Sequence, residues 1–151
     1  MVGAGDNSSR NVKSFSPGFG FVQLEACHMV RILLLEAHPV VRRVLHRILQ
    51  TQPDFFVVGE ATDGWIALDL LDRLGATVVI SEFALPGLNG VEVARCIKRR
   101  FPECKVILFS LRDDPVYVTY ALAHGVERYI SKLAPVDDLL EGIRAVSGLK
   151  V

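Results

Sequence analysis

The sequence has few cysteines, no long hydrophobic run and no excess of charge of either sign. Cys27, Cys96 and Cys104 form no C-x-x-C pair and have no histidine at metal-ligand spacing, which argues against a disulfide framework or a zinc site. Lys plus Arg number 17 and Asp plus Glu number 17, so no overall electric field attracts nucleic acid. Because no apolar run approaches the ~20 residues needed to cross a bilayer, and no secretory signal begins the chain, we expect a cytoplasmic protein with no membrane partner.

The apolar content is sufficient for one hydrophobic core, since 50% of the 151 residues are hydrophobic. Residues 1–28 differ from the rest: they are rich in Gly, Ser and Asn up to about Gly20, with one apolar patch at 19–24. We expect a flexible N-terminal extension there. The pair His28-Met29 is also what a common cloning junction encodes, so the extension is either native or vector-derived. The single domain is expected over 29–151.

From Met29 onward, short apolar runs alternate with segments of helical periodicity. The expected strands are Val30 to Leu35, Phe55 to Gly59, Thr77 to Ser81, Lys105 to Phe109 and Arg128 to Ser131. Helices are expected to begin at Pro39, after Asp63-Gly64, after Asn89, at Pro115 with Asp113 or Asp114 as its cap, and at Pro135.

Each expected helix has an apolar stripe for the core. In the first helix the stripe is Val40, Val41, Val44, Leu45, Ile48 and Leu49, and in the second it is Ile66, Ala67, Leu70, Leu71 and Leu74. Five strands that alternate with five helices predict an α/β fold with a doubly wound parallel sheet, because every parallel connection needs a crossover. In such sheets the functional crevice lies beyond the carboxyl ends of the strands. The residues at those ends are Glu36, Ala37, His38, Glu82, Ser110 and Lys132.

These strand ends carry four motifs in a characteristic order. They are R-I-L-L-L-E-A-H-P-V-V-R from Arg31, V-V-I-S-E-F-A-L-P-G-L-N-G from Val78, K-V-I-L-F-S from Lys105, and A-x-G-V-x-R-Y-I-S-K from Ala123. Together they resemble the CheY-like receiver domain of response regulators, and within that group the NarL/FixJ type. The resemblance covers Met29 to about Val146 and implies a five-stranded flavodoxin-like sheet of order 2-1-3-4-5. It also implies that Tyr129 is the aromatic switch residue, and that Ser110 and Lys132 lie on the phosphate side of the site.

The resemblance further implies an Asp after the third strand that accepts a phosphoryl group, and a divalent cation held by an acidic pair after the first strand. This sequence departs at both places, because the acceptor position is Glu82 and the acidic pair is Glu36-Ala37. Mg²⁺ requires near-octahedral oxygen geometry and tolerates misplaced ligands poorly. We therefore expect no cofactor, weak or absent Mg²⁺ binding, no efficient phosphorylation and no enzymatic activity.

Two interpretations of Glu82 are open. Its carboxylate, one methylene longer than that of Asp, can reach Lys132 and the hydroxyl of Ser110 and imitate part of the phosphorylated state. Alternatively, Glu82 and Lys132 are a structural ion pair that remains in a decayed site.

Other polar and aromatic residues have plainer interpretations. His38 before Pro39 is expected to cap and pack a helix start rather than to bind metal. The basic cluster at 98–100 is expected to be a solvated helix end. Trp65 is either an exposed contact or a lid on the edge of the core.

The leading function is an atypical receiver that acts independently of aspartate phosphorylation and regulates an output, transcription above all, through protein–protein association as a homodimer. DNA is expected to be contacted only through an effector domain absent from this chain, or through a partner protein. Two alternatives are a slow phosphoacceptor that uses Glu82, and a small-molecule sensor whose crevice is apolar at Ala37, Phe83 and Ala84.

Overall fold

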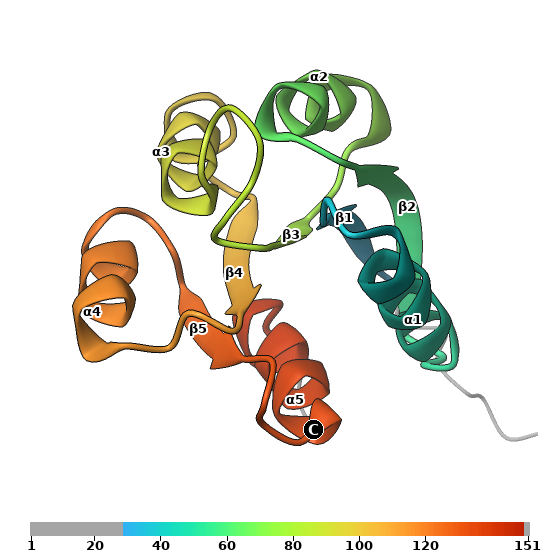
Figure 1. Cartoon of the computed structure of the whole chain (residues 1–151). Coiled ribbons are helices and arrows are strands. Elements are labelled where there is room, and N and C mark those ends of the chain that lie inside the picture. Colours follow the sequence, from blue (N-terminus) through green and yellow to red (C-terminus); the bar gives the residue numbers. More distant parts are fainter. Residues whose placement is uncertain (1–28, 150–151) are drawn as a thin grey trace, which may run out of the picture.

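A parallel sheet with helices on both faces forms the domain in the computed structural model, which describes residues 29–149 (Figure 1). The strands are β1 (Val30–Leu35), β2 (Phe55–Ala61), β3 (Val78–Ser81), β4 (Lys105–Ser110) and β5 (Arg128–Ser131). The helices are α1 (Pro39–Gln50), α2 (Gly64–Leu74), α3 (Gly90–Arg100), α4 (Pro115–Ala123) and α5 (Val136–Val146). The extension predicted for residues 1–28, and Cys27 within it, lie outside the described residues.

The sheet has the order β2-β1-β3-β4-β5 and every pairing is parallel, which confirms the predicted fold class. Side chains along β1 alternate between two cores, as the pleat of a strand requires. Leu33 and Leu35 belong to the core under α2, α3 and α4, whereas Ile32 and Leu34 belong to the core under α1 and α5 (Figure 1). Both faces of the sheet are therefore buried, and only its edges and strand ends remain for function.

Three predicted core positions are wrong. Val40 and Val44 on α1 are 58% and 50% exposed, and Ile66 on α2 is 43% exposed. A helix buries only the side chains that point at the sheet, and in α1 these are Leu45 and Leu49, with Val41 and Ile48 half-buried beside them. A stripe of six apolar residues was too wide for one face, so its outer members face solvent.

The helix caps agree in part with those predicted from the sequence. His38 caps α1 as predicted, because its Nδ1 accepts from the backbone N–H of Val41 at 3.4 Å. The predicted cap of α4 is wrong: Asp114 is at the N-cap position but makes no side-chain cap bond, while Asp113 accepts from the Ser131 hydroxyl at 3.1 Å. Pro135 is the residue before α5 rather than its first residue.

Among residues 29–149, no helix combines the length and apolarity that a membrane crossing requires. Cys104 is buried and Cys96 is half-buried. Burial raises the pKa of the Cys104 thiol to about 11, so this thiol is unreactive at neutral pH.

Candidate functional site

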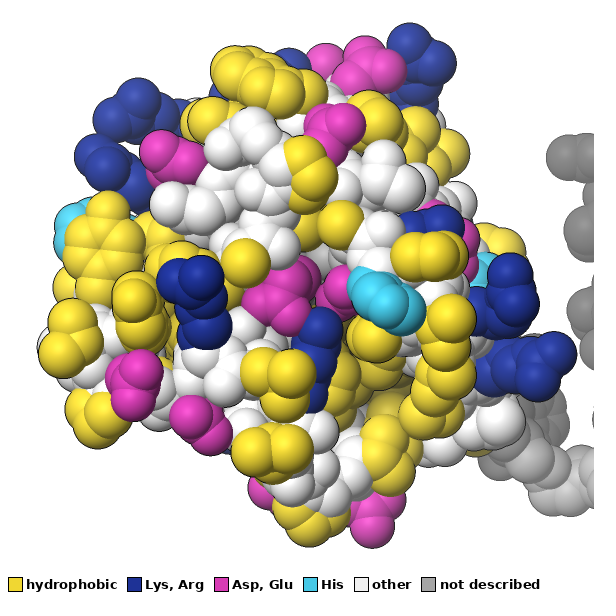
Figure 2. Space-filling model, in the orientation of Figure 1, with side chains coloured by type: hydrophobic (Ala, Val, Ile, Leu, Met, Phe, Trp, Pro, Cys, Tyr) yellow, Lys and Arg dark blue, Asp and Glu magenta, His cyan; other side chains and the backbone are white. Residues whose placement is uncertain are grey.

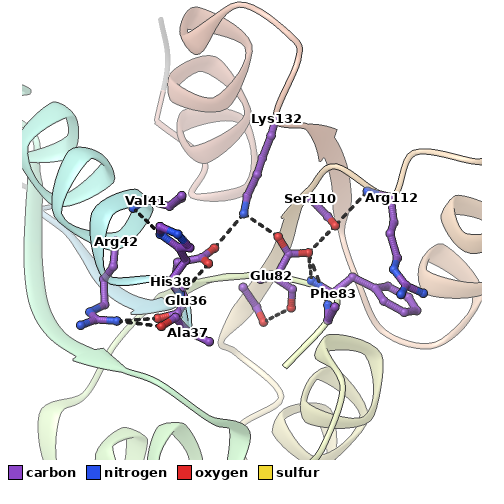
Figure 3. Close-up of polar contacts among 12 residues, drawn as sticks. Glu36, Ala37, His38, Val41, Arg42, Glu82, Phe83, Ser110, Arg112 and Lys132 are labelled. Atoms are coloured by element: carbon purple, nitrogen blue, oxygen red, sulfur yellow. Dashed lines mark hydrogen bonds and ion pairs between the residues drawn. The ribbon is translucent and has the colours of Figure 1, made fainter. Parts of the chain in front are cut away.

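Four polar side chains from four strand ends meet at the carboxyl edge of the sheet (Figure 3). Glu36 follows β1, Glu82 follows β3, Ser110 is the last residue of β4 and Lys132 follows β5. Parallel strands place these ends side by side, so residues almost a hundred positions apart in the chain come into contact.

Lys132 lies between the two glutamates. Its Nζ is 2.9 Å from Oε2 of Glu36 and 2.5 Å from Oε2 of Glu82, and the three side chains are only 13%, 5% and 12% exposed. Burial lowers the pKa of Lys132, but hydrogen bonds and coulombic attraction to Glu82 and Glu36 outweigh it and raise the pKa above its ordinary value. The ammonium group is therefore charged at neutral pH and offsets one of the two carboxylates.

The other oxygen of Glu82 accepts three hydrogen bonds. Oε1 accepts from the hydroxyl of Ser110 and from the backbone N–H groups of Phe83 at 2.6 Å and Ala84 at 3.3 Å. The loop folds tightly enough for this because Gly90 has no side chain: a Cβ there would overlap the backbone carbonyl of Glu82. The carboxylate of Glu82 is held from both sides and points into the site.

The loop after β1 is held by its own backbone and by α1. Oε1 of Glu36 accepts from the backbone N–H of His38 at 3.1 Å. Arg42 donates to the carbonyl of Glu36 at 2.9 Å and to that of Ala37 at 3.5 Å. The half-exposed Ala37 presents only a methyl group where the resemblance implies a second carboxylate.

The donor set of this site does not fit a Mg²⁺ ion. Each carboxylate oxygen of Glu36 and Glu82 already accepts a hydrogen bond or an ion pair, and the Lys132 ammonium lies between the two groups. In the described part of the chain, no group of three or more His, Cys, Asp or Glu side chains is arranged to hold a metal ion. A hard cation with several oxygen ligands would have to displace the lysine.

Tyr129 connects the site to the loop between β4 and α4. Its hydroxyl donates to the carbonyl of Arg112, and the backbone N–H of Arg112 donates to the Ser110 hydroxyl at 3.1 Å. Burial, followed by nearby carboxylates, raises the pKa of Tyr129 despite its interaction with Ser110. The neutral phenol is therefore the form that donates this bond.

Sequence reasoning missed Arg112 and misjudged Lys98. Arg112 lies in a loop beside Asp113 and Asp114, and no spacing distinguishes it from a solvated side chain. Lys98 was expected at a solvated helix end, but its Nζ forms a half-buried ion pair with Glu127 and donates to the Cys104 carbonyl at 2.9 Å. Trp65, left open by the sequence, is an exposed side chain at 64%.

Comparisons with known proteins give matches over most of the chain. Residues 32–144 match the family described as the response regulator receiver domain. The chain is 33% identical over 118 residues to the transcriptional regulatory protein DegU of Brevibacillus brevis, covering 78% of this chain and 50% of that protein. It is 32% identical over 121 residues to the transcriptional regulatory protein LiaR of Bacillus subtilis (strain 168), covering 79% and 56%.

Among solved structures, a two-component response regulator of the LuxR family from Aurantimonas sp. SI85-9A1 superposes with a TM-score of 0.75 at 27% identity, covering 80% of this chain and 86% of that one. The chain spans about half the length of the curated relatives it matches.

Proposed function

Because this chain belongs to the response regulator receiver domain family, we propose that it is a receiver that acts without aspartate phosphorylation and works by associating with a second protein surface. The observation that carries the proposal is the position of the Glu82 carboxylate, which contacts both Lys132 and Ser110. In a phosphorylated receiver, the family resemblance implies, these two residues contact the phosphoryl group.

Glu82 supplies part of what a phosphoryl group supplies. Its contacts are charge-assisted, which makes them about twice as strong as hydrogen bonds between neutral groups. A carboxylate carries about one charge, against −1.5 to −2 for a phosphoryl group. Lys132 offsets one of the two carboxylates of the site and leaves about one net negative charge, and we propose that Mg²⁺ binds weakly or not at all.

The surface that supports association is α4. Its nine residues include no Asp, Glu, Lys or Arg, yet only Ala121 is buried. Val116, Tyr120 and Leu122 are 77%, 43% and 48% exposed, and Leu111 in the preceding loop is 60% exposed. The apolar side chains over α4 lie on the left of Figure 2. A helix that is apolar on all sides normally lies within a core, so an exposed one favours an interface.

We propose that a second copy of the chain covers α4. A two-fold interface places the same residues of both copies against each other, and α4 has no charges that would then repel. The helix is ~13 Å long, so it supplies only part of the ~800 Å² per partner of a standard interface. The dimer is therefore expected to be weak and to depend on concentration. The relatives named above are transcriptional regulators, which supports transcription as the controlled output.

One set of sedimentation measurements tests the proposal. The wild type is expected to dimerise as concentration rises and to respond little to Mg²⁺ with beryllium fluoride. Val116→Glu introduces a charge that two copies would bring together, and is expected to be monomeric. Val40→Glu is the matched control, because Val40 on α1 is also an exposed valine, at 58%. Glu82→Gln removes the charge from the site and is expected to weaken the dimer.

Each opposite result removes a part of the proposal. Dimerisation that requires Mg²⁺ and beryllium fluoride would show a working phosphoacceptor site. Loss of the dimer in Val40→Glu but not in Val116→Glu would place the interface on α1. An unchanged dimer in Glu82→Gln would leave Glu82 as a structural ion-pair partner only.

A further inference from the structure

Arg112 is tied through its backbone to two parts of the site. It lies in the loop between the end of β4 and the start of α4. Its N–H donates to the Ser110 hydroxyl at 3.1 Å, and this hydroxyl in turn donates to Glu82. Its carbonyl accepts from the Tyr129 hydroxyl. The backbone of one exposed loop residue therefore meets both the Glu82 cluster and β5.

The side chain of Arg112 reaches two further elements. Its guanidinium carbon is 5.8 Å from the ring centroid of Phe83 and 5.6 Å from that of Tyr117. The two rings pack edge to face, with centroids 5.2 Å apart and planes at 67°. Phe83 directly follows Glu82, and Tyr117 lies in the first turn of α4. Figure 3 shows the guanidinium group beside the Phe83 ring.

Both distances lie within the ~6 Å at which a cation is attracted to the face of an aromatic ring. The described part of the chain offers Arg112 no carboxylate within ion-pair distance, and its neighbour Asp113 accepts from Ser131 instead. The aromatic pair is therefore the partner of the guanidinium charge.

We propose that Arg112 is a positioning residue. Its guanidinium contacts Phe83 and Tyr117, and these contacts hold the β4–α4 loop and the start of α4 against the loop that begins at Glu82. These contacts set the position of α4 while the site holds no phosphoryl group. This role goes beyond the function proposed above, because it concerns a single chain and is present whether or not α4 meets a second copy.

The chemistry of residue 112 allows a clean test. Both of its hydrogen bonds to the site are made by its backbone, so Arg112→Gln removes the guanidinium and keeps the backbone donor and acceptor. Each exposed cation–ring contact corresponds to about a 2- to 5-fold change in an equilibrium. Loss of both contacts in Arg112→Gln is therefore expected to speed amide hydrogen exchange over residues 111–123 about 5-fold or more.

The exchange is measured on the full chain, with Arg99→Gln as the matched control because Arg99 is an exposed arginine on α3. Three results together support the positioning role of Arg112. Exchange becomes faster in Arg112→Gln and only over residues 111–123, stays unchanged in Arg99→Gln, and recovers in part in Arg112→Lys. Lysine keeps the charge that the rings attract. An unchanged rate in Arg112→Gln overturns the proposal, and so does faster exchange throughout the sheet.

A double-mutant cycle identifies the partner ring. In a Tyr117→Leu background, Arg112→Gln is expected to have a smaller effect on exchange than in the wild type, because one of its two contacts is already absent. Equal effects in the two backgrounds would mean that Arg112 and Tyr117 act independently, which overturns the link to α4. A wild type that stays monomeric in the sedimentation experiment would contradict the proposed dimer and leave this cycle unaffected.

Discussion

Replacing Lys132 by methionine is expected to destabilise the domain strongly at neutral pH. Methionine has a similar length and no charge, so it leaves Glu36 and Glu82 facing each other with no cation between them. At an effective dielectric constant of about 20, two unit charges separated by the 2.9 Å of the Lys132–Glu36 contact attract by ~6 kcal/mol. The cost of removing these groups from water offsets much of that attraction.

Removal of one partner from a buried pair typically costs about 3–5 kcal/mol, because the remaining charge is buried without compensation. All three side chains here are less than 15% exposed, so this range applies. In a domain of this size it corresponds to a fall of roughly 10–20 °C in Tm.

The assay is urea unfolding of wild type and Lys132→Met at neutral pH, followed by circular dichroism. Arg73→Met is the control, because Arg73 pairs with Asp69 at 3.0 Å while both side chains are more than 60% exposed. That variant should lose less than about 1 kcal/mol. A loss below about 1 kcal/mol in Lys132→Met would refute the view that the lysine compensates a buried acidic pair.

Two further outcomes follow from the site. The raised pKa of Lys132 means that the folded state holds this proton more tightly than the unfolded chain, so its stabilising effect is complete below about pH 10.5 and is lost as the pH rises through the folded pKa; the raised pKa of Tyr129 acts with the same sign. Unfolding midpoints should therefore drop as the pH rises above about 10, and a midpoint that stays level there would contradict the shifts. Gly90→Ala would place a Cβ against the backbone of Glu82 and should cost about 1–3 kcal/mol in thermal or urea unfolding, whereas wild-type stability would mean that the loop is not closely packed.

The strands and their order were readable from the sequence because both faces of the sheet are buried. A strand covered on both faces consists of consecutive apolar residues, such as Ile32 to Leu35, and this pattern has few other interpretations. The buried face of each helix was harder to predict. Val40 and Val44 are as apolar as Val41, and only the direction of α1 over the sheet decides which of them is covered.

The residues of the candidate site were likewise predicted only in part. Glu36, Glu82, Ser110 and Lys132 were predicted to share one edge because they follow strand ends, which is a matter of chain order. The role of Arg112 required coordinates, since its partners Phe83 and Tyr117 precede and follow it by no regular spacing.

By itself the sequence determined the class of fold, the edge that carries the polar residues, and the absence of a second carboxylate at Ala37. These depend on hydrophobic periodicity and residue identity, which are local properties. Only the tertiary structure decided that Lys132 lies between two glutamates, that every carboxylate oxygen there has a partner, and that residues 29–149 leave most of α4 exposed. Such facts arise from distances between elements far apart in the chain, where an ångström separates an ion pair from two solvated charges.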